Sequence, residues 1–181
     1  MDRGRIVLVL GLVLLVGGVL VGCRGPAKGT AEWHFDKALE LKDESRYDEA
    51  IEEYTKAIEL DADLAMAYVN RAVAYGNKGQ YDLAIADCTK AIELDADLAV
   101  AYVSRAAAYG NKGEYDLAIA DCTKAIELDP NLAIAYYKRG YAYKEQGKKA
   151  EAIADFEKFI NLTNNPQWLE MARQQIEELT K

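Results

Sequence analysis

Apolar and polar positions follow a helical spacing along most of this chain, and the pattern repeats every 34 residues. The repeating units are residues 31–64, 65–98, 99–132 and 133–166. In the second unit the spacing predicts one amphipathic helix near 64–78 and another near 82–94. The second and third units differ at only six of 34 positions, which indicates internal duplication. Such a period predicts stacked helical hairpins, because each hairpin must bury its apolar face against its neighbours.

Short polar residues and glycines mark the ends of the predicted helices. Three residues stand where an N-cap is expected before the first helix of a unit: Asp63, Asp97 and Asn131. Three glycines stand where a left-handed residue would end that helix: Gly79, Gly113 and Gly147. The first unit has Ser45 at this place, which predicts a looser turn there.

The chain ends in one more predicted helix. Asn165 and Pro166 form a cap and a first turn, and an apolar stripe then follows at helical spacing: Trp168, Leu169, Ala172, Ile176 and Leu179. We expect this helix to cover the open end of the fourth unit, because a terminal repeat has no neighbour there. The predicted organisation is therefore a targeting segment at 1–23, a linker at 24–30, four units over 31–164 and a capping helix at 165–181.

The first 23 residues have the pattern of an export signal. Arg3 and Arg5 precede an unbroken run of Ile, Val, Leu and Gly over 6–21, and Leu20-Val21-Gly22-Cys23 follows its end. This ending resembles the lipobox of bacterial lipoproteins, which implies cleavage after Gly22 and lipidation of Cys23. Two or more acyl chains give stable membrane anchoring. The resemblance implies an exported protein held at the outer membrane or on the outer face of the cytoplasmic membrane. The alternative is an uncleaved N-terminal membrane anchor, although sixteen helical residues rise only about 24 Å.

The repeat itself resembles the tetratricopeptide repeat (TPR). The resemblance rests on the 34-residue register and on small residues at the two places where paired helices cross: Ala38 with Ala50, Ala72 with Ala84, Ala106 with Ala118, and Gly140 with Ala152. It implies an all-α, right-handed α-solenoid of four helix-turn-helix units followed by the capping helix. It also implies that the first helices line a concave groove that holds a partner peptide or helix.

The resemblance assigns groove-facing positions to particular residues. The predicted partner-binding residues are Phe35, Leu39, Met66, Val69, Asn70, Val73, Asn77, Val100, Val103, Ser104, Ala107, Asn111, Ile134, Tyr137, Lys138 and Tyr141. Many are apolar, and contiguous exposed apolar surface typically marks an interface. Some family members grip a C-terminal carboxylate with Lys, Asn and Arg in this groove. At those places this chain has Phe35, Leu39, Val100 and Ser104, and only Asn70 matches, so that clamp is not expected.

Charge and residue chemistry exclude several classes of function. The formal net charge is −8, and the basic residues are dispersed, so the chain is not expected to bind nucleic acid. Cys88 and Cys122 occupy equivalent core positions on helices expected to lie about 8–10 Å apart, beyond disulfide reach, so buried free thiols are expected. His34, the only histidine, has no partners for catalysis and is expected to pack. We expect no catalytic site, no metal site and no cofactor.

One polar pair recurs in the repeats. Arg71, Arg105 and Arg139 stand 16 residues before Asp87, Asp121 and Asp155, and the first unit has Lys37 and Glu53 at the same places. We predict an ion pair between the two helices of each unit. Such pairs, if half-exposed, would contribute about 0–1 kcal/mol each.

Two functions from different classes fit these patterns. The first is a membrane-anchored adaptor that binds a partner protein in the groove. The second is a membrane-tethered scaffold of the cell envelope that self-associates, which would make the chain a homo-oligomer.

Overall fold

A computed structural model describes residues 26–181, so the export signal and the predicted lipidation site at Cys23 lie outside the described residues. Within 26–181 the chain forms nine α-helices and no strand. They are α1 (Ala31–Asp43), α2 (Tyr47–Leu60), α3 (Ala65–Asn77), α4 (Tyr81–Leu94), α5 (Ala99–Lys112), α6 (Tyr115–Leu128), α7 (Ala133–Glu145), α8 (Lys149–Leu162) and α9 (Pro166–Thr180). None of these nine helices is both long and apolar enough to cross a membrane.

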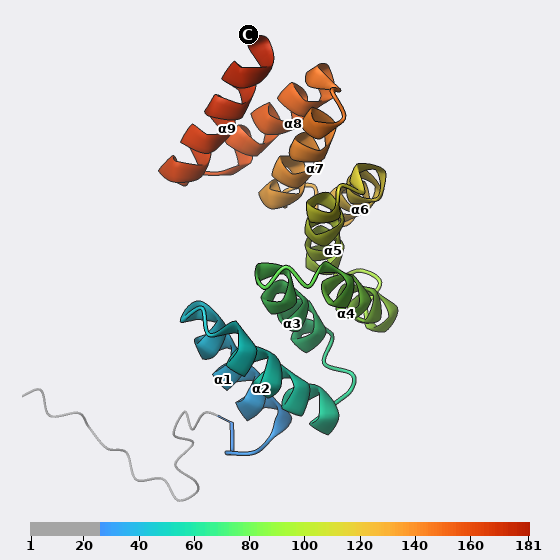
Figure 1. Ribbon diagram of the computed structural model, residues 1–181, viewed down its shortest axis with the longest axis vertical. Helices are drawn as coiled ribbons and strands as arrows, with labels where there is room; N and C mark the ends of the chain where they lie inside the picture. The colour runs from blue at the N-terminus through green and yellow to red at the C-terminus, as the bar shows by residue number, and fades with distance from the viewer. Residues whose placement is uncertain (1–25) are drawn as a thin grey trace, which may run out of the picture.

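The helices pack in chain order as four antiparallel hairpins, with α9 packed on α8 (Figure 1). The first helices of the hairpins, α1, α3, α5 and α7, also contact one another in sequence and form an inner row. The stack curves into an open C, with α1 and α2 in one arm and α8 and α9 in the other (Figure 1). The prediction of a helical solenoid with four units and a capping helix is confirmed.

The core of each hairpin depends on small residues where its two helices cross. Ala38, Ala50, Ala72 and Ala84 are buried, and Gly140 takes the same place in the fourth unit. A Cβ on Gly140 would lie 3.1 Å from Cε1 of Phe156, so the glycine makes room for that ring. The prediction of free cysteines is confirmed for Cys88 and Cys122. Burial raises the pKa of both thiols to about 12, which keeps them protonated and unreactive at neutral pH.

The helix starts differ from the sequence prediction. The N-cap positions of α3, α5 and α7 are Leu64, Leu98 and Leu132, and none has a side-chain capping bond. The aspartates two residues before the predicted caps form a different side-chain hydrogen bond, within the turn that precedes the helix. Asp61, Asp95 and Asp129 each accept a hydrogen bond from the backbone N–H two residues later, at 2.9–3.0 Å. The predicted caps at Asp63, Asp97 and Asn131 are therefore wrong, because the polar interaction tightens the turn before the helix.

The turns inside the hairpins share one backbone conformation. Gly79, Gly113 and Gly147 have φ values of 74°, 79° and 73°, as predicted. Ser45 adopts the same left-handed conformation, with φ of 62°, so the looser turn expected in the first unit is wrong. Backbone hydrogen bonds hold it there: Arg46 N donates to Leu41 O at 2.9 Å, as Gln80 N does to Tyr75 O in the second unit.

Replacing Ser45 by Gly is expected to raise the free energy of unfolding by up to about 1 kcal/mol, because a Cβ in the left-handed region costs about 1–2 kcal/mol. Urea unfolding of the two proteins would measure the change. Gly113→Ser, at the equivalent turn of the third unit, is the matched control and should lower stability by a similar amount. A destabilised Ser45→Gly variant would contradict the strain assigned to this residue.

The capping helix is held at its start and along one face. The Asn165 side chain accepts hydrogen bonds from the backbone N–H groups of Gln167 and Trp168 at 3.0 and 3.3 Å. Ala172 and Leu179 are buried against the fourth unit, where they join the clusters around Phe159 and Phe156. The predicted cover over the fourth unit is thus confirmed.

The predicted ion pairs between paired helices are also confirmed. Arg105 donates from Nε and Nη2 to the two carboxylate oxygens of Asp121, both at 2.8 Å. A third donor, Nη1, reaches Thr89 of the preceding unit at 3.1 Å. The same three contacts recur at Arg71 and Arg139. The carboxylates are buried rather than half-exposed, so these pairs tie each hairpin together and also link it to its predecessor.

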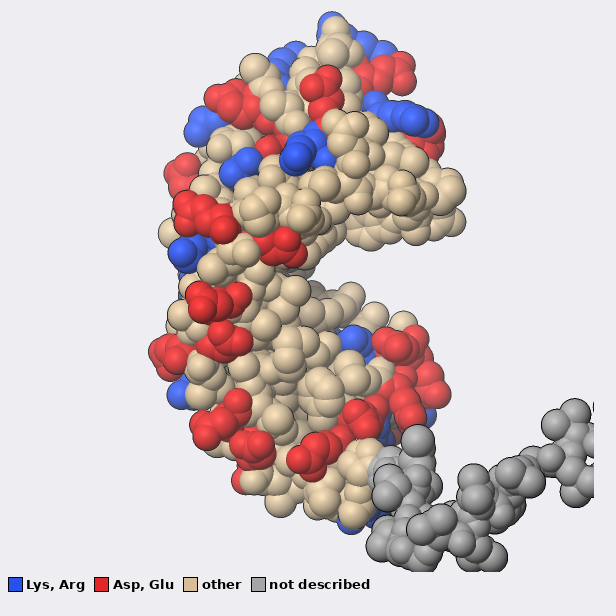
Figure 2. Space-filling model, turned by 180° about the vertical axis from the view of Figure 1, so that it is seen from behind, with Lys and Arg blue, Asp and Glu red and all other residues tan. Residues whose placement is uncertain are grey.

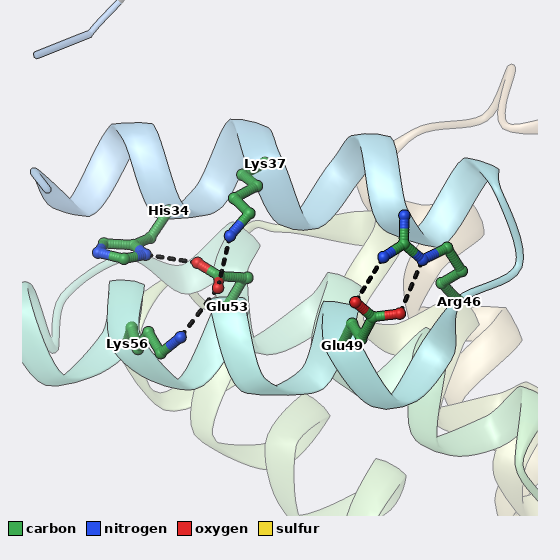
Figure 3. A network of polar contacts seen from close by, with 6 residues as sticks. All are labelled: His34, Lys37, Arg46, Glu49, Glu53 and Lys56. Atoms are coloured by element: carbon green, nitrogen blue, oxygen red, sulfur yellow. Dashed lines mark hydrogen bonds and ion pairs between the residues drawn. The ribbon is translucent and has the colours of Figure 1, made fainter. Parts of the chain in front are cut away.

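The first unit has a different polar cluster at the same position (Figure 3). Glu53 is buried and accepts hydrogen bonds from His34 Nδ1 at 2.6 Å and from Lys37 and Lys56 Nζ, both at 2.9 Å. Burial acts to raise the pKa of Glu53, but these three donors together lower it to about 2. His34 therefore has a polar structural contact in addition to the packing role predicted for it.

The Glu53 cluster predicts an acid-sensitive first unit. The folded-state pKa of Glu53 lies below its ordinary value of about 4.3, so its stabilising contribution is present above pH 4.3 and is lost as pH falls towards 2. Glu53→Gln should therefore destabilise the protein at pH 7 and have less effect at pH 2.5, measured by urea unfolding at both values. Glu52→Gln, which removes an exposed neighbouring charge, should show no such pH dependence. An equal cost of Glu53→Gln at both pH values would contradict the prediction.

Candidate functional site

The inner row of helices lines a groove that opens between the two arms of the C (Figure 2). Two cavities of about 330 Å³ each lie along its floor. The central cavity lies between α3 and α5, under Gly76, and the C-terminal cavity lies between α5, α7 and α9, under Gly110. A Cβ built on either glycine would meet no atom within 4 Å, so both positions leave open space in the groove.

The sixteen predicted groove residues fall into three groups, of which the first two share Ala107, Asn111 and Lys138. Seven line the central cavity or its edge: Val73, Asn77, Val103, Ser104, Ala107, Asn111 and Lys138. Five line the C-terminal cavity: Ala107, Asn111, Tyr137, Lys138 and Tyr141. The remaining seven line neither cavity: Phe35, Leu39, Met66, Val69, Asn70, Val100 and Ile134. The structure therefore concentrates the predicted residues towards the centre and the C-terminal arm.

Two of the predicted valines offer little surface to a partner. Val69 is 4% exposed and packs with Tyr68, Ala91 and Ala101, at the place where neighbouring units meet. Val103 is similarly buried against Ala125 and Ala135, although it reaches the edge of the central cavity. The expectation that these two side chains form an exposed groove floor is wrong, because consecutive first helices pack directly against each other there.

The C-terminal cavity has a rigid aromatic wall. Tyr137 is part of a cluster in which its ring centroid lies 5.6 Å from that of Phe156, 5.1 Å from Phe159 and 5.7 Å from Trp168. Tyr141 stands one helical turn further along α7 and is 43% exposed. Such pairs stabilise a fixed arrangement of rings, so this cavity is formed in advance of any ligand.

Sequence reasoning missed two residues of this cavity, Trp168 and Met171, which come from the capping helix. Trp168 was predicted as part of the buried stripe, and Met171 lies beside that stripe. Trp168 is 36% exposed and Met171 is 46% exposed, and both face the cavity edge. The other groove residues were predicted from their positions in the 34-residue repeat. Trp168 and Met171 lie outside the repeat, so no such position predicts them.

The polar groups of the groove are few. Lys138 lines both cavities and forms no ion pair with any residue of the described chain. Asn77 and Asn111 are exposed amides beside the two floor glycines. Asn77 Nδ2 donates to Val73 O at 2.9 Å, so Asn77 offers its Oδ1 to the backbone N–H groups of a ligand, and Asn111 can offer both amide groups. No cluster of His, Cys, Asp and Glu within 26–181 could hold a metal ion. This arrangement, apolar walls with two amides and one lysine, can bind a polypeptide.

The fold and the groove agree with the comparison to protein families. Tetratricopeptide-repeat family models match residues 65–98 and 99–132, and two further models of the same repeat match 38–79 and 122–154. The chain belongs to the tetratricopeptide-repeat family. The comparison with curated proteins found no match.

Solved structures include similar solenoids, two of them with bound peptides. The first TPR domain of Spaghetti (RPAP3) bound to the HSP90 peptide SRMEEVD is 27% identical, with a TM-score of 0.63 over 70% of this chain and 99% of that one. The second TPR domain of human RPAP3 in complex with the HSP70 peptide SGPTIEEVD is 33% identical, with a TM-score of 0.59 over 65% and 95%. MamA is 25% identical, with a TM-score of 0.66 over 83% and 86%.

Proposed function

We propose that this protein is a membrane-anchored adaptor that holds a segment of a partner protein in its concave groove. The observation that carries the proposal is the pair of largely apolar cavities on the inner face, each lined by a glycine and flanked by an exposed amide. Related TPR domains bound to HSP90 and HSP70 peptides support a polypeptide ligand. The membrane anchor is lipid on Cys23, and this part rests on the sequence of residues 6–23.

Crosslinking in the source cell would test the groove. The wild-type protein and a Val73→Asp, Tyr141→Ala variant would be expressed at equal levels, crosslinked mildly and purified with their partners. Both replaced side chains are exposed, so the fold should survive, and circular dichroism would check this. We expect the variant to lose a partner that the wild type captures.

A matched control uses the opposite face. Leu83 and Leu117 are both 48% exposed on second helices, at equivalent repeat positions. Leu83→Asp, Leu117→Asp removes as much exposed apolar surface from the outer side and should leave the partner in place. Loss of the partner only with this control variant would assign binding to the outer face and reject the groove. Capture of the protein itself alone would support the self-associating scaffold.

Metabolic labelling with a palmitate analogue would test the anchor. We expect wild-type protein to carry the label and to sediment with membranes, and Cys23→Ala to lose the label. An unlabelled wild-type protein of uncleaved size in the membrane fraction would instead support the N-terminal membrane anchor.

A further inference from the structure

The two ends of the groove have different chemistry, which restricts the ligand. At the C-terminal end, the exposed side chains of Tyr141, Trp168 and Met171 surround the C-terminal cavity, and Lys138 is the only charged residue that lines it. In Figure 2 the tip of the upper arm beside the opening is correspondingly free of charged side chains. An anchor for this end must be a bulky apolar side chain, because only such a group gains from displacing water there.

The other end of the groove is acidic. Asp36, Glu40 and Asp43 follow one another at spacings of four and three residues, which places them on one side of α1. That side faces away from Ala38 and Leu41, which are buried against α2. Figure 2 shows acidic side chains gathered on the lower arm next to the opening. A ligand that crosses from one arm to the other therefore passes from an apolar cavity to a negative surface.

These acids are available to a ligand. Asp36 and Glu40 form no ion pair within the described chain, and Asp43 has only a long contact to Lys42 at 3.8 Å while its side chain is 79% exposed. The nearby Lys42 is mostly buried, and its ammonium donates to the Asn70 side chain of α3 at 3.2 Å. Lys37, which lines the same hollow as Asp36 and Glu40, contacts Glu53 at 2.9 Å. Both lysines beside the acids are thus engaged elsewhere, whereas the three acidic residues are exposed.

We infer that the groove binds a protein segment with a bulky apolar anchor at one end and Lys or Arg residues at the other. This inference rests on the proposed function and specifies the partner for the same groove. The anchor occupies the C-terminal cavity and the basic residues lie beside α1. Lys138, in between, donates a hydrogen bond to a backbone carbonyl of the segment. Complementary charge sets the orientation of the segment and excludes acidic ones.

The selectivity differs from that of the peptide complexes described above. The peptides SRMEEVD and SGPTIEEVD each end in two glutamates, a valine and an aspartate. In this chain Phe35 and Leu39 stand where a basic clamp for such an end would be needed, and α1 adds three acids beside them. An acidic peptide would meet repulsion at α1 and no clamp.

A peptide series measured against the full-length protein in a neutral detergent tests the inference. Each peptide carries a Trp-Leu anchor and three Lys separated by Gly/Ser spacers of roughly 4, 8 or 12 residues, which reach about 13, 27 or 41 Å when extended. Matched peptides replace Lys by Glu or by Ser, and SRMEEVD serves as a further probe. Fluorescence anisotropy should give tightest binding for one Lys spacing, weaker binding for Ser and none for Glu or SRMEEVD. Added salt should weaken the Lys peptide alone.

Two variants separate the two ends of the groove. Asp36→Asn, Glu40→Gln, Asp43→Asn should weaken the Lys peptide about tenfold and remove its salt dependence, while the Ser peptide is unchanged. Met171→Asp should weaken both peptides more than tenfold, because it places a charge in the C-terminal cavity. Leu83→Asp on the outer face is the control and should change neither.

The outcomes distinguish this inference from the proposed function. Equal binding of Lys, Ser and Glu peptides, all lost with Met171→Asp, would overturn the charge selection while the groove still binds protein. Failure of every peptide to bind would also overturn the inference, and partner capture in cells would then decide the proposed function separately. Self-association that is blocked by Met171→Asp would assign the groove to a second copy of this chain and overturn both.

Discussion

Replacing Asp121 by Ala is expected to lower the free energy of unfolding by about 3–5 kcal/mol, the usual cost of breaking a buried ion pair. The reason is the environment of Arg105, whose guanidinium is mostly buried and donates twice to Asp121. Without the carboxylate, that charge keeps one hydrogen bond, to Thr89, and its position over the Tyr102 ring, 5.8 Å from the ring centroid. Because Arg105 also links the third unit to the second, we expect the third and fourth units to lose stability together. Urea unfolding followed by circular dichroism would measure the change.

An exposed ion pair provides the control for Asp121→Ala. Lys112 contacts Asp82 at 2.7 Å, but the Asp82 side chain is 85% exposed. Asp82→Ala removes an ion pair of similar length that joins the second unit to the third. Water replaces the lost contact, so the unfolding midpoint should hardly move. If Asp82→Ala and Asp121→Ala lowered the free energy of unfolding by similar amounts, burial would not determine how much these ion pairs stabilise the protein.

The repeat register predicted which residues meet inside a hairpin but not how deeply they are buried. The spacing of 16 residues in the sequence predicts that Arg105 lies opposite Asp121. The contact to Thr89 was not predicted, because it crosses between units and depends on the angle at which they stack. That angle arises from side-chain packing along the whole interface, and one sequence does not specify it.

The groove was predictable by position and less so by exposure. Helical register correctly placed Val73, Lys138 and Tyr141 on the inner face. Helical register also predicted that Val69 lines the groove, but the close approach of α3 and α5 buries that side chain. Met171 was not predicted because α9 lies outside the repeat, and its orientation depends on how a non-repeating helix docks. The lipid anchor at Cys23 stays a prediction from sequence.

Replacing Phe156 by Ala is expected to lower the free energy of unfolding by about 3–5 kcal/mol, because the fully buried ring fills the core of the fourth unit. The equivalent residues of the second and third units are Cys88 and Cys122, which are much smaller and face Ala72 and Ala106. In the fourth unit the larger ring is accommodated by Gly140, where an added Cβ would lie 3.1 Å from Phe156 Cε1. The glycine at residue 140 therefore leaves the room that the Phe156 ring occupies in this core.

A double-mutant cycle tests this coupling between Gly140 and Phe156. In the Phe156→Cys background, Gly140→Ala recreates the pair found in the second and third units and should stabilise the protein by about 1 kcal/mol through helix propensity. The new methyl group would lie 3.2 Å from Asp155 Cβ in both backgrounds, and in wild type it also meets the ring. Gly140→Ala should therefore be less favourable in wild type by at least about 0.5 kcal/mol. Gly110→Ala, which meets no neighbouring atom, should have the same effect in both backgrounds. A Gly140→Ala effect that is equally independent of residue 156 would show that the glycine does not accommodate the ring.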